Sequence, residues 1–311
     1  PTKGSEKTKI IAALEKLQAG GSTAGGEGIE LAYNTAKKNF IKGGNNRVIL
    51  ATDGDFNIGV SSTSELTRLI EKKMKDGIYL TCLGFGMGNY KDGRLEELSN
   101  KGNGNGYYID NLLEAKKVLV DQIGGTLYTI AKDVKLQVEF NPSLVKAYRL
   151  VGYENRLLNR EEFNDDKKDA GELGAGHTVT ALYEIIPAGS NEQIPTVDSL
   201  KYQKPNTIEL NKYSKELLTC KIRYKKPNED NSILLEYPVD YNPIEFKNSS
   251  EDHRFAGSVA AFAQILRNSE FKGDADLNFV LETARNAKGD DTFSYKEDFI
   301  RVVKMAKELS K

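Results

Sequence analysis

The sequence predicts an α/β doubly wound domain, an antiparallel β-sandwich and a C-terminal helical segment, in that order along 311 residues. Three changes of pattern predict this fold class. Helical stretches alternate with short apolar runs up to about residue 125, apolar residues then recur at every second position up to about residue 247, and the helical period returns from residue 248. We therefore expect three domains, 1–125, 126–247 and 248–311.

The first domain combines amphipathic helices with apolar strands. Ser62–Glu65 has the pattern of a capping box and opens one of the helices. Helices are expected over 10–17, 29–40, 66–74, 92–100 and 113–123. The strands are continuous apolar runs, which is typical of parallel strands that are buried on both faces. Such strands are expected over 48–51, 78–85 and 107–109.

The spacing of apolar residues also predicts the strands of the second domain and the helices of the third. Val134–Phe140 alternates strictly, and Asn141-Pro142 ends this strand with turn residues. Further strands are expected over 145–153, 177–186, 217–224 and 233–238, with a long polar loop over 154–176. Helices are expected over 255–266, 277–284 and 299–306, with N-terminal caps from Asp274, Asp276 and Asp291. Three short helices bury little by themselves, so we expect them to dock on another layer.

Composition excludes several classes of function. Lys and Arg together number 44 and Asp and Glu 45, and the two signs are interspersed, which argues against nucleic acid or an anionic membrane as partner. No apolar run approaches the roughly 20 residues that a membrane helix needs. Two cysteines, Cys82 and Cys220, are expected to be buried free thiols. The sequence contains only two histidines, His177 and His253. With so few cysteines and histidines, a zinc site or a histidine-based catalytic triad is not expected.

The strongest candidate site combines one hydroxyl with one carboxylate. Thr23 lies in a Gly-rich turn, Gly20–Gly28, at the start of a helix, and Asp53 follows the apolar strand 48–51. Both residues should lie at one edge of the α/β sheet, where such folds bind ligands, and both are hard oxygen ligands. The alternative is that Thr23 caps a helix and Asp53 forms a turn. The Gly-rich turn lacks the Lys-Ser/Thr ending of a phosphate-binding loop.

Other acidic residues point to structure rather than chemistry. Asp55 and Asn57 flank the candidate site and are expected to be turn residues. Asp165, Asp166, Asp169 and Glu172 form an acidic stretch. This stretch lacks the alternating ligand spacing and the central glycine of a calcium loop, so we expect a solvated loop.

The motifs Gly20–Ile29 and Arg47–Gly54 resemble those of the von Willebrand factor type A (VWA) domain. The whole chain resembles bacterial VWA proteins with a C-terminal region of unknown function. Four further segments carry this resemblance: Lys132–Lys135, Tyr148–Arg156, Asp169–His177 and Phe255–Phe262. The resemblance implies a Rossmann-like VWA fold for the first domain. It also implies a metal ion-dependent adhesion site for Mg²⁺, in which Thr23 and Asp53 occupy the matching positions, and a place at the cell envelope or periplasm.

The chain departs from the family pattern in one respect. The family supplies further Mg²⁺ ligands from an Asp-x-Ser-x-Ser turn after the first strand, and no such sequence occurs here. We expect that the N-terminal part of the VWA domain is absent and that the site is complete only in the full-length protein. Mg²⁺ binding to this chain alone should be weak or absent. The missing strand would leave an apolar sheet edge: either a second polypeptide or a further segment supplies the missing elements, or the chain associates through that edge.

These observations predict a non-enzymatic binding or adhesion protein. The predicted mechanism is Mg²⁺ at Thr23 and Asp53 bridging to a carboxylate of an unidentified protein partner, without nucleic acid and without a membrane-spanning segment. One alternative is a metal-independent structural scaffold. The other is a Mg²⁺-dependent phosphoester or nucleotide hydrolase that uses the Gly-rich turn, with Asp53 or Glu27 as general base.

Overall fold

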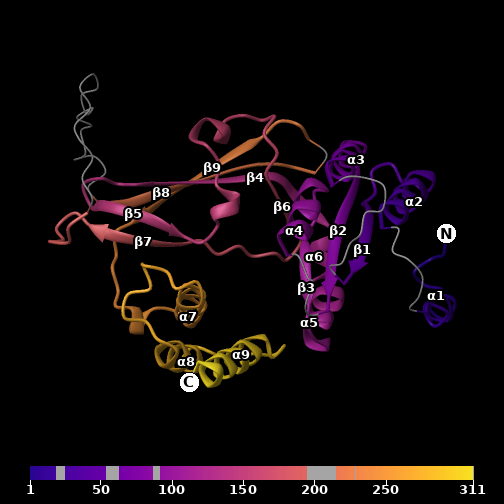
Figure 1. Ribbon diagram of the computed structural model, residues 1–311. Coiled ribbons are helices and arrows are strands. Elements are labelled where there is room, and N and C mark those ends of the chain that lie inside the picture. The colour runs from indigo at the N-terminus through magenta and orange to yellow at the C-terminus, as the bar shows by residue number, and fades with distance from the viewer. Residues whose placement is uncertain (19–24, 54–62, 87–91, 195–214, 228, 311) are drawn as a thin grey trace. The chain divides into compact units, whose positions relative to one another are not determined.

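The computed structural model describes residues 1–18, 25–53, 63–86, 92–194, 215–227 and 229–310, drawn as ribbon in Figure 1. They form two compact units, and each unit collects segments that are distant in sequence. Unit 1 comprises Pro1–Lys135, Asn164–His177 and Arg223–Leu234. Unit 2 comprises Leu136–Phe163, Thr178–Ile222 and Leu235–Lys311.

Unit 1 contains a three-stranded parallel sheet in the order β1-β2-β3. Its strands are β1 (Asn46–Thr52), β2 (Ile78–Phe85) and β3 (Gly106–Ile109). All three expected strands are confirmed, and β2 has the predicted bounds. The strands end in register, since Thr52 is opposite Gly84 and Gly84 is opposite Tyr108. Residues that follow these strands therefore meet at one edge of the sheet.

Alternate side chains of the sheet belong to two different clusters. Cys82 packs in a core with α2 (Gly25–Lys38), α3 (Thr63–Lys75) and α4 (Asp92–Lys101). The next residue, Leu83, packs instead with Ile109 and with Val118 of a π-helical turn, Lys117–Asp121. That turn lies between α5 (Leu112–Lys116) and α6 (Ile123–Leu127). Because neighbouring residues of a strand point to opposite faces, helical segments pack on both faces of this sheet.

The first helix differs from expectation. α1 (Lys7–Leu14) begins and ends three residues earlier than the expected helix 10–17, and it buries no residue. Ile11, Leu14 and Leu17, the apolar residues that predicted a buried face, are exposed among the described residues. The apolar stripe of this helix therefore lacks a described surface to pack against.

The expected antiparallel strands form two sheets. One sheet has the order β6-β4-β8-β9 and the other pairs β5 with β7. The strands are β4 (Thr129–Phe140), β5 (Val145–Val151), β6 (Gly171–Gly174), β7 (Leu182–Pro187), β8 (Glu216–Lys225) and β9 (Ile233–Asp240). The antiparallel content is confirmed, whereas the packing of the sheets as a sandwich, the doubly wound order and the three domain boundaries stay predictions.

Two expectations for the second domain are wrong in detail. β6 lies inside the stretch predicted to be a loop, because Gly-Glu-Leu-Gly is too short and too rich in glycine to show a period of two. The strand expected from His177 begins only at Leu182. The backbone N–H of Gly174 donates to Nδ1 of His177 at 3.3 Å, so the imidazole closes the turn after β6.

The acidic stretch is exposed at Asp165, Asp166 and Asp169, as expected for a solvated loop, whereas Glu172 lies in β6 and is half-buried. Lys225 Nζ donates to Asp133 Oδ2 at 2.7 Å and to the backbone oxygen of Asp166 at 2.6 Å. Lys135 is only 2% exposed and donates to the backbone oxygen of Asp165. Lysines of β4 and β8 therefore hold the backbone of this stretch across 30 and 59 positions of the chain, which the local sequence pattern could not show.

The helices at the C-terminal end of the chain pack together in unit 2 (Figure 1). They are α7 (Glu251–Leu266), α8 (Leu277–Asn286) and α9 (Tyr295–Leu309), and they share one apolar core. Asp276 caps α8 by accepting from the N–H of Phe279, and Asp291 accepts from two N–H groups at the start of α9. Within unit 2 the helical segment contacts β5, because Arg149 bonds to Gln264 and lies over the Phe271 ring. Docking of these helices on a β layer through a shared core stays a prediction, because the described apolar core contains residues of the helices alone.

Candidate functional site

The carboxyl edge of the parallel sheet holds the one predicted site residue that the structure describes. Asp53 directly follows β1 and is exposed, and Gly86 directly follows β2. A Cβ at Gly86 would lie 3.8 Å from the Cβ of Asp53, so the two strand ends are adjacent. Tyr108 Oη donates to the Gly86 carbonyl oxygen at 2.6 Å, which ties the end of β3 to the same place. The ends of β1, β2 and β3 therefore lie next to one another at the edge that carries Asp53.

The next residues along this edge begin a helix. Asp110 follows β3 and is exposed. Asn111 Oδ1 accepts from the backbone N–H of Leu113 at 2.8 Å and from that of Glu114 at 3.0 Å, which caps α5. A carboxylate and a helix N-terminus therefore accompany Asp53 on the same side of the sheet.

Thr23 lies outside the described residues, as do Asp55 and Asn57. The nearest described residue on its C-terminal side is Gly25, which begins α2. α2 contributes the buried Ile29 and Tyr33 to the core with β1 and leads through residues 39–45 into the start of β1. A helix followed by so short a connection runs back along its strand, so its first turn points toward the edge where β1 ends. The convergence of Thr23 with Asp53 stays a prediction.

Metal binding by the described residues alone is incomplete. No group of three or more His, Cys, Asp or Glu side chains within the described ranges is arranged to hold a metal ion. Mg²⁺ takes about six oxygen ligands, and Asp53 supplies one carboxylate toward that number. The edge therefore fits a metal only when it is completed by residues beyond those that the structure describes.

The opposite edge of the sheet carries a polar cluster that the sequence did not indicate. Arg47, near the start of β1, donates from Nη1 to Thr81 Oγ1 at 2.8 Å, and its guanidinium lies 5.6 Å from the centroid of the Tyr79 ring. Asn103 Nδ2 donates to Glu172 Oε1 at 2.8 Å. We call Arg47, Tyr79, Asn103 and Glu172 the amino-edge cluster. The sequence shows Glu172 as part of the acidic stretch and Asn103 between two glycines, but no local pattern brings these residues together.

Burial dominates the electrostatics of the amino-edge cluster. The pKa of Glu172 is raised from 4.5 to about 7, mainly by desolvation; the carboxylates Asp133 and Asp169 contribute to the rise, and the hydrogen bond from Asn103 opposes it. Desolvation likewise lowers the pKa of Arg47. The pKa of Asp169 is raised, first by burial and then by Asp133. Ionisable groups therefore lie together at this end of unit 1, where Arg47 and Glu172 are half-buried and Asp169 is exposed.

Glycines allow the chain to approach the sheet closely at the amino edge. A Cβ at Gly104 would lie 1.8 Å from the carbonyl oxygen of Leu80, which no other residue could tolerate in this backbone. The backbone N–H of Leu80 donates to the Gly102 oxygen at 2.9 Å. The Gly-rich segment 102–106 therefore packs on β2, and this packing positions the side chain of Asn103.

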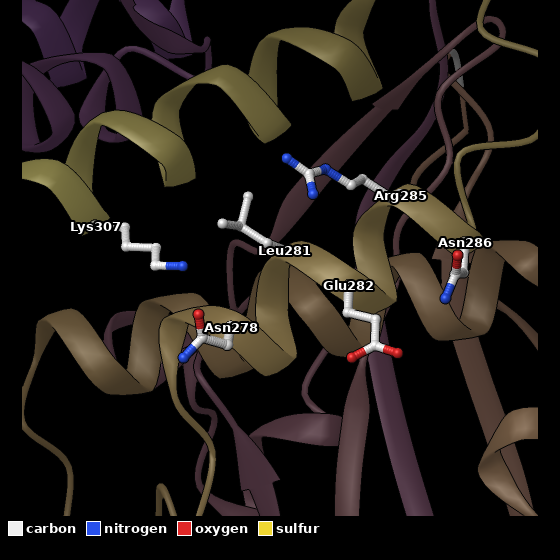
Figure 2. A pocket seen from close by; sticks show the side chains of 6 residues that line it. All are labelled: Asn278, Leu281, Glu282, Arg285, Asn286 and Lys307. Atoms are coloured by element: carbon white, nitrogen blue, oxygen red, sulfur yellow. The ribbon is translucent and has the colours of Figure 1, made fainter.

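A surface pocket of about 400 Å³ lies on the helical segment of unit 2, between α8 and α9 (Figure 2). It is lined by Asn278, Leu281, Glu282, Arg285, Asn286 and Lys307. Figure 2 shows Arg285 and Lys307 on either side of Leu281, with Glu282 pointing away from them. The pocket carries charges of both signs and contains none of the predicted site residues, so it does not indicate a particular ligand.

None of the helices among the described residues combines the length and the apolar character required to cross a bilayer.

Comparison with known proteins identifies both halves of the chain. The family profile described as "von Willebrand factor type A domain" matches residues 1–121. The profile described as "Uncharacterized protein YfbK, C-terminal" matches residues 125–309. The chain is 43% identical over 303 residues to the Escherichia coli K12 protein named "Uncharacterized protein YfbK", an alignment that covers 97% of this chain and 52% of that protein. The chain thus spans about half the length of the curated relative that it matches.

Solved structures resemble the chain only in part. A von Willebrand factor type A protein from Catenulispora acidiphila aligns with 97% of this chain and 67% of its own, at a TM-score of 0.45 and 16% identity. The conserved hypothetical protein BatB from Bacteroides thetaiotaomicron aligns with 38% of this chain and 68% of its own, at a TM-score of 0.31 and 21% identity. Likenesses this partial carry no information on function.

Proposed function

The chain belongs to the family of VWA domain proteins that carry the YfbK C-terminal domain, and on that premise we propose that it is a non-enzymatic protein that binds another protein. The proposed contact surface is the carboxyl edge of the parallel sheet. One observation carries the proposal: the Asp53 carboxylate is exposed at the end of β1, beside the ends of β2 and β3. VWA domains commonly mediate interactions between proteins, which supports this choice over catalysis.

The proposed mechanism uses a divalent cation. Asp53 and Thr23 would hold Mg²⁺ together with ligands from outside this chain, because no Asp-x-Ser-x-Ser turn occurs in the 311 residues. Mg²⁺ keeps several waters in its coordination shell, and a carboxylate of the partner would replace one of them. The role of Asp53 is then to fix the cation at the sheet edge, and the rest of the chain orients that edge.

Calorimetric titration of the full-length protein with Mg²⁺ tests this mechanism. We expect binding that the Asp53→Ala substitution abolishes, since it removes the only carboxylate ligand proposed for this chain. Asp76→Ala is the matched control, because Asp76 is an exposed aspartate of the same unit that precedes the start of β2 rather than following a strand end. Unchanged Mg²⁺ affinity in the Asp53→Ala protein, or an equal loss in the Asp76→Ala protein, contradicts the proposal.

Two further measurements separate this function from its alternatives. Partner capture that EDTA leaves unchanged would indicate a metal-independent scaffold. Turnover of nucleotides or phosphoesters that requires Mg²⁺ and is lost in the Asp53→Ala protein would indicate a hydrolase. We expect chelator-sensitive binding and no turnover.

We propose a second contact surface along the lateral edge of β1, on the side away from β2. Within the described part of the sheet β1 pairs with β2 on one side only. Ile49 of β1 is 47% exposed. An apolar edge strand with unpaired backbone groups is a template for pairing with another strand, so this edge supports association with a second polypeptide.

A further inference from the structure

We propose that the helical segment of unit 2, from α7 to α9, is a detachable module that a polar clip fastens to the end of β5. The clip consists of Arg149 and Glu154 on the side of β5, and of Gln264, Arg267 and Phe271 on the side of the helices. In the undocked state the clip is open, while the β strands and the helical segment both remain folded. This proposal is independent of the function proposed above.

The first argument is that the helical segment has an apolar core of its own. Phe262 of α7, Val280 of α8 and Ile300 of α9 are buried, and they belong to one cluster whose members all come from these helices. Within this cluster the ring centroid of Phe299 lies 5.4 Å from that of Phe255 and 5.6 Å from that of Phe262. Burial of these side chains therefore stabilises the segment through contacts among its own helices.

The second argument is that Arg149 contacts the helical segment through its guanidinium. Arg149 Nε donates to Glu184 Oε2 at 2.7 Å, and the two residues are opposite each other on β5 and β7, so the guanidinium is held in one orientation. Its Nη2 donates to Gln264 Oε1 at 3.4 Å, which is a long hydrogen bond, and its Cζ lies 4.1 Å from the centroid of the Phe271 ring. Phe271 is 52% exposed, so this contact covers only part of the ring.

A strained turn after β5 positions the second half of the clip. Gly152 and Tyr153 both have positive φ, 83° and 64°, which is uncommon for a tyrosine. Tyr153 Oη donates to the carbonyl oxygen of Thr180 at 2.8 Å, and this hydrogen bond supports the turn. Glu154 follows directly, and its Oε1 lies 2.8 Å from Nη2 of Arg267, the residue after α7. Both side chains of this ion pair are exposed, and exposed ion pairs add little to stability.

The third argument is the connection that leads into the helical segment. β9 ends at Asp240 and α7 begins at Glu251, and the residues from 241 to 248 are all exposed. Phe246, near the end of this connection, packs on α7, where its ring centroid lies 5.8 Å from that of His253. An exposed connection does not by itself hold the helices against the strands, so docking depends on side-chain contacts such as those of the clip.

The two kinds of contact differ in strength. The helices are held together by buried apolar side chains, whereas the clip combines an exposed ion pair, a long hydrogen bond and a cation–π contact with a half-exposed ring. The clip should therefore open under milder conditions than those that unfold the helical segment. A partner that binds only the docked or only the undocked state would shift the equilibrium toward that state.

The Phe271→Trp substitution gives a reporter of the clip in the full chain, which contains no tryptophan. An indole ring binds a guanidinium at least as well as a phenyl ring does, so the docked state is retained. In a urea titration we expect a first transition in which the indole becomes more accessible to quenching by acrylamide. Over that range, hydrogen exchange resolved by residue should show the amides of Ile300 and Val303 in α9 as protected as they are without urea.

Three variants of the reporter protein test the clip itself. Arg149→Met keeps the aliphatic stem and removes the guanidinium, so without urea its indole should already be as accessible as it is after the first transition. Glu154→Gln removes the exposed ion pair at the surface and should move the first transition to lower urea. Arg156→Met is the matched control, because Arg156 is an exposed arginine of the turn after β5 that lies outside the clip, and it should leave the transition unchanged.

Amide protection of β5 and β7 shows whether each variant keeps its sheet. Should Arg149→Met disturb the sheet, the Glu154→Gln protein still decides the question. Quenching of the indole that changes only at the urea concentration where α9 loses protection overturns the proposal, because the strands and helices would then unfold together. A first transition that neither Arg149→Met nor Glu154→Gln alters overturns it as well.

Discussion

At the scale of single residues, the interior of unit 1 contains polar atoms that burial has changed chemically. Burial raises the pKa of Cys82 to about 12, so this thiol is inert and the prediction of a buried free cysteine is confirmed. Cys220 is also free, but it is only half-buried, so the prediction is wrong about its burial. Tyr33 is 0% exposed, and desolvation strongly raises its pKa. The Tyr33 side chain therefore contributes to the core by the packing of its aromatic ring.

The Tyr33 hydroxyl gives a prediction at this scale. Among the described residues, no group forms a hydrogen bond with the Tyr33 hydroxyl. A buried hydroxyl without a partner destabilises a protein by about 1–3 kcal/mol. Tyr33→Phe removes the oxygen and keeps the ring, so it should raise the free energy of unfolding by about 1 kcal/mol, measured by urea denaturation followed by circular dichroism. Tyr33→Leu is the comparison that removes the ring, and it should destabilise unit 1. A loss of stability in the Tyr33→Phe protein would show that the hydroxyl has a partner.

At the scale of elements, β1 is an edge strand of the described parallel sheet and is covered only in part. Val48 is buried in the core, but the following residue, Ile49, is exposed on the opposite face. The neighbouring β2 is buried along almost its entire length. One face of β1 thus packs in the core, while its lateral edge has no partner strand in the described part of the sheet. This arrangement favours pairing with a further strand.

The edge of β1 predicts concentration-dependent association. In sedimentation velocity the chain should shift from monomer toward dimer as its concentration rises. Ile49→Lys places a charge on the edge strand and should abolish this shift. Ile244→Lys is the control, because Ile244 is similarly exposed but lies outside any strand. Association that is absent in the unmodified chain, or that persists in the Ile49→Lys protein, argues against the edge as a contact surface.

At the scale of the whole molecule, the apolar interior is divided. One core is built around Leu80 in unit 1, and another is built around Ile300 and Val280 of the helical segment in unit 2. Substitution in one core removes contacts that the other core does not share. The two units therefore have separate sources of stability.

This division predicts that two core substitutions act on different parts of the chain. Leu80→Ala and Ile300→Ala each remove a fully buried side chain and should each destabilise their own unit by about 2–5 kcal/mol. Hydrogen exchange resolved by residue measures this directly. Leu80→Ala should reduce protection in β2 and leave α9 unchanged, and Ile300→Ala should do the reverse. Equal loss of protection in both places would mean that the chain unfolds as one cooperative unit.

Local patterns were sufficient for much of this fold. The continuous apolar run 78–85 predicts β2 with its observed bounds, and strict alternation predicts β4 over most of its length. The helical stripes predict α7, α8 and α9, and the position of Asp53 after an apolar strand places it at the carboxyl edge. Where a pattern was weak, prediction failed: β6 has four residues, two of them glycine, and was taken for a loop.

The sequence by itself determined the elements, their types and the exposed carboxylate at one sheet edge, because strands and helices impose their periods on neighbouring residues. Only the tertiary structure decided which charges are buried and which groups meet them. Glu172 reaches Asn103 across 69 residues, and Lys225 reaches Asp133 across 92. The pKa of a carboxyl and the fate of a polar loop depend on such contacts, because desolvation is set by how distant parts of the chain pack around a group and not by the residues next to it.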